Sequence, residues 1–247
     1  MLESQVQVLA IGMSEPAGAS GVEADLVAIA AAGGRGTAVV TAMAVEAGGA
    51  SRLITPIGGK DLRALMRGAE ARELAAIKLG MLPSDHLVSA AADELRDGAR
   101  PLVVADPVLG APGFRAGERL LQAYCNELLP LVDAVTADLQ EATALVGEPL
   151  DRHGLIRALV EMGARWVVLK GEAQAGGEIE DLISDGQRWF QVRSEPAEVP
   201  LEGADAAFAS TLAVLMARGE SVAQAAGQAR HRLLERARRA APAGARP

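Results

Sequence analysis

Apolar residues along this chain fall into two alternating patterns. Short, mostly apolar runs such as Leu102–Asp106 are typical of buried strands. Longer stretches such as Leu87–Asp97 repeat apolar residues every three or four positions, as a helix with one buried face does. Strands that alternate with helices predict repeated βαβ units, and therefore an α/β fold with a central, mostly parallel sheet flanked by helices.

These patterns assign most of the chain to the sheet and its flanking layers. The predicted parallel strands are Val6–Gly12, Thr37–Val45, Ala75–Leu79, Leu102–Asp106, Ala134–Thr136 and Trp166–Leu169. The predicted helices are Gly21–Ala32, Asp61–Glu73, Leu87–Asp97, Gly117–Leu129, Leu139–Val146, Leu155–Met162, Asp205–Arg218 and Val222–Ala240.

The pattern changes in the last third of the chain. The segments Glu178–Ser184 and Gln187–Val192 alternate apolar and polar residues and are joined by Asp185-Gly186, which predicts a small β-hairpin near 178–192. No repeat or linker divides the chain. We therefore expect residues 1–241 to form a single domain and residues 242–247 to form a short flexible tail.

Composition and charge narrow the classes of function. Half of the 247 residues are hydrophobic, which excludes an intrinsically disordered chain. The 24 Lys and Arg residues are outnumbered by 32 Asp and Glu, so a net charge of −8 argues against nucleic acid as a partner. Cys125 is the only cysteine, which excludes an intrachain disulfide and fits a reducing cytoplasm. No charge-free run is long enough to span a membrane, so we expect a cytoplasmic protein without a membrane partner.

Common phosphate and metal motifs are missing. The Gly-Gly-Lys at 58–60 lacks the spacing of a Walker A loop. His86, His153 and His231 are scattered and have no metal-ligand spacing. Hydride transfer and zinc-dependent hydrolysis are therefore disfavoured.

Five segments carry a stronger signal because they occur in a fixed order, at or just after predicted strands. They read IGMSEPAGASGVEADL at 11–26, KLGML at 78–82, ADPVL at 105–109, TADLQEA at 136–142 and VLKG at 168–171. In this order they resemble the hydroxymethylpyrimidine/phosphomethylpyrimidine kinases of thiamine biosynthesis, a branch of the ribokinase-like superfamily. The resemblance spans nearly the whole chain and implies a three-layer ribokinase-like fold.

The resemblance also implies a reaction and a site. It implies ATP-dependent phosphoryl transfer to the hydroxymethyl or phosphomethyl group of a small-molecule aminopyrimidine, with Mg²⁺ held by Glu141. Both substrates are expected at the carboxyl ends of the strands, as in open α/β sheets generally. The residues implied for the pyrimidine are Gly12, Asp25, Glu46, Met81 and Val108. The residues implied for the nucleotide are Asp138, Lys170, Gly203, Ala204 and Ala206.

The segment that resembles the catalytic turn departs from the family pattern. The family has Gly-Thr-Gly-Cys where this chain has Gly203-Ala204-Asp205-Ala206, and wider relatives carry a catalytic Asp at the last position. Alanine has no proton to exchange, and loss of a general base typically costs about 100- to 10,000-fold in rate. Asp205 is a substitute base only if the turn is shifted, because adjacent helical side chains point about 100° apart. The structural alternative is that Asp205 caps the following helix.

Other predicted site residues also have structural alternatives. Glu46 stands where the family has Gln; it would accept a hydrogen bond from an exocyclic amine, or it is a solvated surface carboxylate. Asp138 replaces the family's Asn, and together with Glu141 it reads as a capping box for Leu139–Val146. Met81 fits core packing as well as a pocket wall.

Three functions remain open from the sequence. The first is a phosphomethylpyrimidine kinase-type enzyme with impaired or rearranged catalysis. The second is a catalytically dead relative that binds a pyrimidine or regulates a partner, and the third is a pyridoxal or sugar kinase of the same superfamily. Superfamily members are often dimers, and an alanine-rich helix surface would permit a homodimer. The arginines of the last helix are interpreted as a solvated face.

Overall fold

A nine-stranded sheet runs through the part of the chain that the structure describes. The computed structural model describes residues 5–15, 18–47, 50–70, 73–97, 101–111, 113–171, 177–196 and 202–240. The strands are β1 (Gln7–Ser14), β2 (Arg35–Ala47), β3 (Ala50–Pro56), β4 (Ala76–Leu79), β5 (Leu102–Ala105), β8 (Ala134–Ala137), β9 (Val167–Leu169), β10 (Ile179–Ser184) and β11 (Trp189–Ser194). Their order across the sheet is β11-β10-β9-β8-β5-β4-β1-β2-β3. A separate two-stranded ribbon consists of β6 (Gly110–Ala111) and β7 (Phe114–Arg115).

The central strands of the sheet are parallel. β1 pairs with β2 and β4, and the parallel pairing continues through β5, β8 and β9. β3 pairs antiparallel with β2, and the β10–β11 hairpin pairs antiparallel with β9. Because the parallel strands point the same way, the residues that follow β1, β4, β5, β8 and β9 meet along one rim of the sheet.

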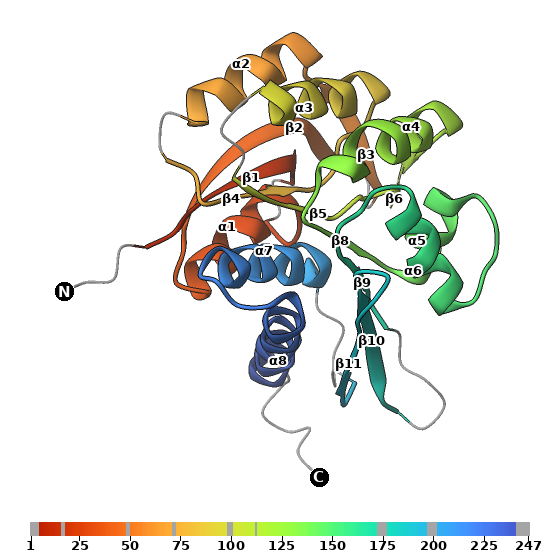
Figure 1. Ribbon diagram of the computed structural model, residues 1–247. Coiled ribbons are helices and arrows are strands. Elements are labelled where there is room, and N and C mark those ends of the chain that lie inside the picture. The colour runs from red at the N-terminus through yellow and green to blue at the C-terminus, as the bar shows by residue number, and fades with distance from the viewer. Residues whose placement is uncertain are drawn as a thin grey trace.

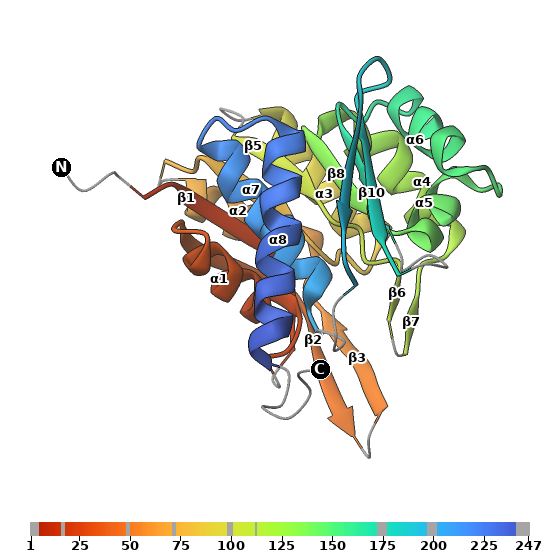
Figure 2. The same ribbon diagram turned by 90° about the horizontal axis from the view of Figure 1, so that it is seen from below.

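Helices cover both faces of this sheet (Figures 1 and 2). One face packs against the second to sixth helices, and the other packs against the first, seventh and eighth. No helix among the described residues is both long and apolar enough to cross a membrane. The helices are α1 (Gly21–Ala31), α2 (Gly59–Glu70), α3 (Asp85–Asp97), α4 (Glu118–Ala123), α5 (Leu139–Val146), α6 (Arg152–Glu161), α7 (Ala204–Ala217) and α8 (Val222–Ala240).

Helix α7 lies between the sheet and α8, which explains its composition. It contacts β4 and β5 on one side and α1 and α8 on the others. Every residue from Ala206 to Leu215 is buried, including the large side chains of Phe208 and Leu212. A helix that is apolar around its circumference is stable only when it is covered on all sides. The N-terminus of α7 therefore has a fixed place at the rim of the sheet.

The predicted α/β architecture with a mostly parallel central sheet is confirmed. The predicted hairpin is also confirmed, and its two strands extend the main sheet. The second strand was predicted to end at Val45, but β2 continues to Ala47 and is followed by the unpredicted β3. The Gly-Gly at 48–49 is a hairpin signal that this prediction overlooked. The predicted tail at 242–247 lies outside the described residues, and the single domain over 1–241 stays a prediction.

Candidate active site

A pocket of about 190 Å³ opens at the carboxyl ends of the parallel strands. Its walls come from the ends of β1, β4 and β5 and from the first turns of α1 and α7. It is also lined by Lys78 and Asp106, which were not among the predicted site residues. The predicted residues that line it are Gly12, Asp25, Met81, Val108, Gly203, Asp205 and Ala206.

Two glycines let the loops approach closely enough to form this pocket. Gly203 has φ +67°, and a Cβ atom there would lie 2.1 Å from the carbonyl oxygen of Ala19. Gly21 has φ +66°, and a Cβ atom there would lie 2.3 Å from the carbonyl oxygen of Met13. Residues other than glycine rarely adopt such φ values, and neither position has room for a side chain. The turns before α1 and α7 therefore depend on glycine.

Asp25 forms the buried end of the pocket. Its Oδ1 lies 2.9 Å from Nζ of Lys78 and accepts a hydrogen bond of 2.8 Å from the Ser210 hydroxyl. Its Oδ2 is buried and has no hydrogen-bond partner among the described residues. Burial raises the pKa of Asp25, and Lys78 and Ser210 offset this only in part. The site therefore holds one buried acceptor that is unsatisfied among the described residues.

Asp106 connects two buried lysines. Its Oδ2 lies 3.6 Å from Nζ of Lys78, and its Oδ1 lies 3.4 Å from Nζ of Lys170. The Thr136 hydroxyl donates to the same Oδ1 at 2.7 Å. Burial alone would raise the pKa of Asp106, but the two ammonium groups and this hydrogen bond outweigh it and lower the pKa. Asp106 is therefore ionised and fixed in place.

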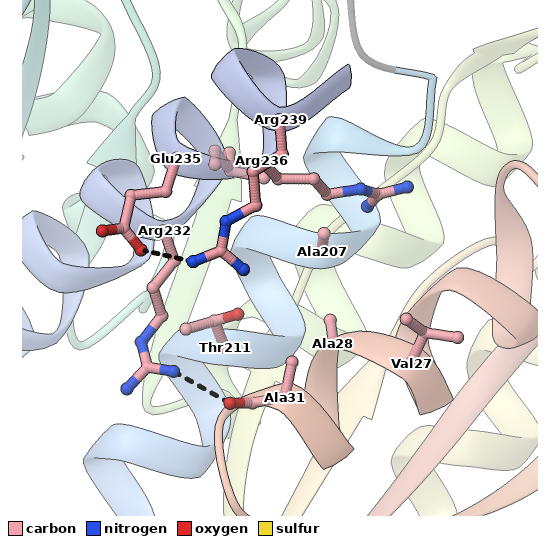
Figure 3. Close-up of a pocket in the computed structure, with 10 residues that line it drawn as sticks. Val27, Ala28, Ala31, Ala207, Thr211, Arg232, Glu235, Arg236 and Arg239 are labelled. Carbon is pink, nitrogen blue, oxygen red and sulfur yellow. Dashed lines mark hydrogen bonds and ion pairs between the residues drawn. The ribbon is translucent and has the colours of Figure 1, made fainter.

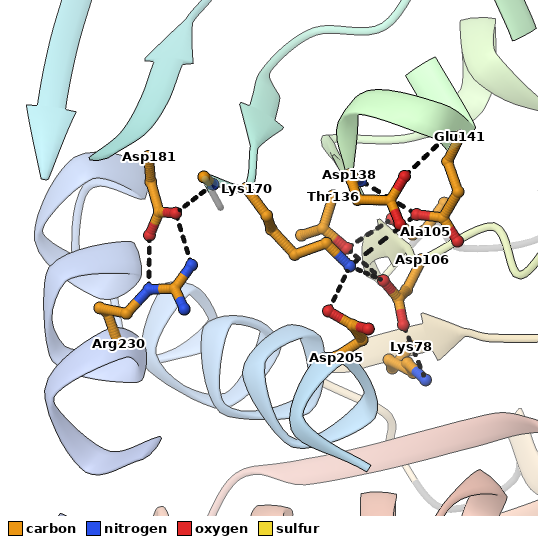
Figure 4. Close-up of polar contacts among 11 residues, drawn as sticks. Lys78, Ala105, Asp106, Thr136, Asp138, Glu141, Lys170, Asp181, Asp205 and Arg230 are labelled. Carbon is orange, nitrogen blue, oxygen red and sulfur yellow. Dashed lines mark hydrogen bonds and ion pairs between the residues drawn. The ribbon is translucent and has the colours of Figure 1, made fainter. Parts of the chain in front are cut away.

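Lys170 extends this chain of charges beyond Asp106 to Asp205 and Glu141 (Figure 4). Its Nζ lies 2.7 Å from Oδ1 of Asp205 and 3.9 Å from Oε2 of Glu141, in addition to its contact with Asp106. Burial alone would lower the pKa of Lys170, but these carboxylates hold it above its ordinary value. Only 6% of the Lys170 side chain is exposed, against 67% for Asp205. The contact that is open to displacement is therefore the one with Asp205.

Asp138 and Glu141 form the predicted capping box at the start of α5. The Asp138 carboxylate accepts from the Glu141 N–H at 2.7 Å, and the Glu141 carboxylate accepts from the Asp138 N–H at 3.0 Å. Burial raises the pKa of Glu141 to about 8 despite the nearby Lys170. No group of three or more His, Cys, Asp or Glu in the described parts of the chain is arranged to hold a metal.

The alternative in which Asp205 caps α7 is wrong. The N-cap is Gly203, and Asp205 lies in the first turn of the helix, where its carboxylate pairs with Lys170. The positive φ also belongs to Gly203, so Asp205 carries no left-handed strain. Ala206 is buried and borders the same pocket. The turn has therefore kept the first of the family's two glycines, and Asp205 and Ala206 present a carboxylate and a methyl group.

The structure brings most predicted site residues together but leaves some apart. Lys170 adjoins the pocket through Asp106 and Asp205, and Ala204 begins α7 beside Gly203. Glu141 is linked to the pocket through Lys170, and Asp138 only through Glu141. Glu46 lies on β2, but its side chain is outside what the structure describes, so its contact stays a prediction. Lys78 and Asp106 were missed, although a charged residue within or directly after an apolar strand is a usable signal.

A second hollow, of about 400 Å³, lies on the other side of α7 (Figure 3). It is bordered by α1, α7 and α8, with Ala28 and Ala207 on its floor and Arg232, Arg236 and Arg239 along its rim. Arg232 donates to the carbonyl oxygen of Ala31 at 2.9 Å, at the C-terminus of α1. None of the predicted site residues lines this hollow.

Comparison with known proteins identifies the family of this chain. The family model for phosphomethylpyrimidine kinase matches residues 15–246. The hydroxymethylpyrimidine/phosphomethylpyrimidine kinase of Haemophilus influenzae is 31% identical over 89% of this chain and 86% of that protein. A thiamine biosynthesis bifunctional protein of Geobacter sulfurreducens is 29% identical over 96% of this chain and 50% of that protein. The structure of the pyridoxal kinase from Staphylococcus aureus matches with a TM-score of 0.85 at 25% identity, over 93% of this chain and 87% of that one, in keeping with the expected ribokinase-like fold. The chain belongs to the phosphomethylpyrimidine kinase family.

Proposed function

We propose that this protein binds an aminopyrimidine and transfers the γ-phosphoryl group of ATP to its hydroxymethyl or phosphomethyl group, at a rate limited by the altered turn at Asp205 and Ala206. One observation supports this above all. A single pocket is lined both by buried Asp25, whose Oδ2 has no partner among the described residues, and by the N-terminal turn of α7. A pyrimidine bound by Asp25 would present its substituent to that turn.

The pyrimidine end of the pocket suits a flat, amino-substituted ring. The free Oδ2 of Asp25 would accept a hydrogen bond from a ring N–H or an amino group. Met81 and Val108 supply apolar walls beside it. A buried acceptor that is left unsatisfied costs about 1 to 3 kcal/mol, so a ligand that satisfies it gains specificity over one that does not.

The phosphate end offers a cation and the first turn of a helix. Lys170 carries a positive charge, and the N-terminal amides of α7 are available to an anion, as in helix-terminus phosphate sites generally. A nucleotide phosphate would compete with the Asp205 carboxylate for Lys170, which lies 2.7 Å away. ATP binding therefore requires Asp205 to move aside or to share the ammonium group.

The carboxylates of Asp138 and Glu141 fit a Mg²⁺ ion that is held mainly by phosphates. Mg²⁺ in such sites commonly takes only one or two protein carboxylates and keeps several waters. When bound, the ion would neutralise charge on the transferred phosphoryl group. Glu141 would first lose its proton, because burial raises its pKa to about 8.

The alternative function is a pyrimidine-binding protein without phosphoryl transfer. It is favoured by Ala206 at the position of the general base and by the ion pair that occupies Lys170. A third candidate, pyridoxal phosphorylation, is favoured by the similarity to the Staphylococcus aureus pyridoxal kinase. A cytoplasmic location and a homodimer stay predictions.

Calorimetric titration with hydroxymethyl aminopyrimidine, together with an assay of ADP release, tests the proposal. We expect saturable binding of the pyrimidine and slow release of ADP. Asp25→Asn should weaken binding at least about tenfold, because a donor then replaces the free acceptor. The control variant Asp93→Asn removes a carboxylate on the surface of α3 and should bind normally.

Each other outcome selects an alternative. Binding without any ADP above the uncatalysed background would replace the proposed function with the binding protein. Binding and phosphorylation of pyridoxal but not of the pyrimidine would select the third candidate. Binding of neither compound would refute all three.

A further inference from the structure

A buried ion pair with the last helix lies beside Gly171, the residue directly after Lys170. Asp181 on β10 is fully buried, and Arg230 on α8 binds both of its oxygens. Arg230 Nε donates to Oδ2 at 2.8 Å, and Nη2 donates to Oδ1 at 2.5 Å. The N–H of Gly171 donates to the same Oδ1 at 2.7 Å. Asp181 therefore links α8 to the residue directly after Lys170 (Figure 4).

The backbone around Lys170 has little room to move. The N–H of Lys170 donates to the carbonyl oxygen of Ala137 at 2.8 Å. On the other side, a Cβ atom at Gly171 would lie 2.2 Å from the carbonyl oxygen of Glu180, so the two chains are in close contact there. Hydrogen bonds on both sides of the Lys170 Cα thus fix the direction in which its side chain leaves the strand.

Arg230 also contacts the helix that carries the altered turn. Its guanidinium carbon lies 5.4 Å from the centroid of the Phe208 ring, within the range of a cation–π contact. Phe208 is buried in α7, about one turn after Asp205. Arg230 therefore contacts α7 directly and is linked to the residue after Lys170 through Asp181.

We infer that Arg230 is a positioning residue for the phosphate end of the pocket. Through Asp181 and Gly171 it holds Lys170 where the ammonium group can meet a nucleotide phosphate, and through Phe208 it holds the α7 turn beside it. The nucleotide part of this inference rests on the proposed function, whereas the holding of Lys170 does not. It also corrects the interpretation of the last helix for Arg230, whose side chain is only 13% exposed, whereas the other arginines of α8 are exposed as expected.

Chemical labelling of lysine amines tests whether Arg230 holds Lys170. Intact protein is treated with acetic anhydride, and mass spectrometry follows acetylation of Lys170. In Arg230→Gln the rate should rise at least about tenfold, because local opening exposes an ammonium group that carboxylates otherwise surround. The matched control is Arg218→Gln. Arg218 also links two helices, because it donates to the carbonyl oxygens of Ala32 at 2.9 Å and Gly33 at 2.7 Å, but it lies at the far end of α7.

A second variant distinguishes a local effect on Lys170 from unfolding of the whole protein. Arg230→Gln leaves the Asp181 charge buried without its partner, whereas Asp181→Asn combined with Arg230→Gln removes both charges. The double variant should label Lys170 as fast as the single one. In both, calorimetry should show ATP bound at least about tenfold more weakly, with the affinity for hydroxymethyl aminopyrimidine within about twofold of the wild type.

The outcomes separate this inference from the proposed function. Unchanged labelling of Lys170 in both variants, or an equal increase in Arg218→Gln, would overturn the positioning role. Equal ATP affinity in the wild type and both variants would overturn the inference that Arg230 positions Lys170 for a nucleotide. The proposed phosphoryl transfer would not be affected by this result. If the wild type binds no ATP yet the variants expose Lys170, the proposed function fails and the role of Arg230 in holding Lys170 is supported.

Discussion

Alternating charges determine the properties of individual residues in the pocket. Lys78 is buried between Asp25 and Asp106, and the two carboxylates outweigh burial and raise its pKa. Lys78 and Lys170 are therefore both charged at neutral pH, and Asp106, which lies between them, is ionised. Glu141 differs, because burial prevails there and raises its pKa to about 8. The charge of this one residue changes near physiological pH.

The stability of the protein should therefore depend on pH through Glu141. The folded state raises its pKa from 4.5 to about 8, so this contribution is fully present below pH 4.5 and is lost as the pH rises through about 8. Its slope is at most about 1.4 kcal/mol per pH unit. Glu141→Gln should flatten the decline, and Gln keeps the capping-box hydrogen bond. Urea unfolding at several pH values measures this.

Asp185→Asn is the control for this prediction. Burial slightly opposes ionisation of Asp185, but hydrogen bonds from Arg188 outweigh it and lower its pKa. Its contribution to stability therefore lies at acid pH and is lost as the pH falls through the lowered value. The variant should leave the slope between pH 4.5 and 8 unchanged. An equal slope in the wild type and in Glu141→Gln would contradict the assigned charge state.

At the scale of secondary structure, the site depends on how α7 begins. Its N-cap is a glycine in the left-handed region, packed against the backbone before α1. Asp205 and Ala206 are then placed by the helix itself. The first turn of α7 is therefore set by backbone contacts that a side chain at Gly203 would disrupt.

Gly203→Ala should destabilise the protein and disturb the pocket. A left-handed φ in a residue other than glycine costs about 1 to 2 kcal/mol, and the 2.1 Å approach to Ala19 adds a clash. The control is Gly147→Ala at the C-terminus of α5, where φ is +83° but no atom lies within 4 Å of the added Cβ. Thermal unfolding should show a larger loss for Gly203→Ala, and only that variant should lose pyrimidine affinity. Equal losses in both would contradict the close packing of the turn.

For the whole molecule, sequence patterning located the sheet, both helical layers and the rim where the pocket opens. It did so because parallel strands bury both faces and read as apolar runs. It could not supply contacts between distant segments. Arg230 lies 49 residues from Asp181 along the chain, and neither residue stands out in its own segment. The conformation of Asp205 could not be predicted from the sequence either, because its partner Lys170 follows β9 and is 35 residues away along the chain.

We expect the pyrimidine end of the pocket to be intact and the phosphate end to be altered. The most direct measurement compares kcat for hydroxymethyl aminopyrimidine between the wild type and the double variant Asp205→Gly, Ala206→Cys, which returns the last two residues of the turn to the family pattern. We predict that kcat rises about 100-fold or more, as restoring a proton-transfer group should allow, while KM for the pyrimidine changes less than about threefold. A wild-type protein that already turns over as fast as the double variant would contradict this expectation.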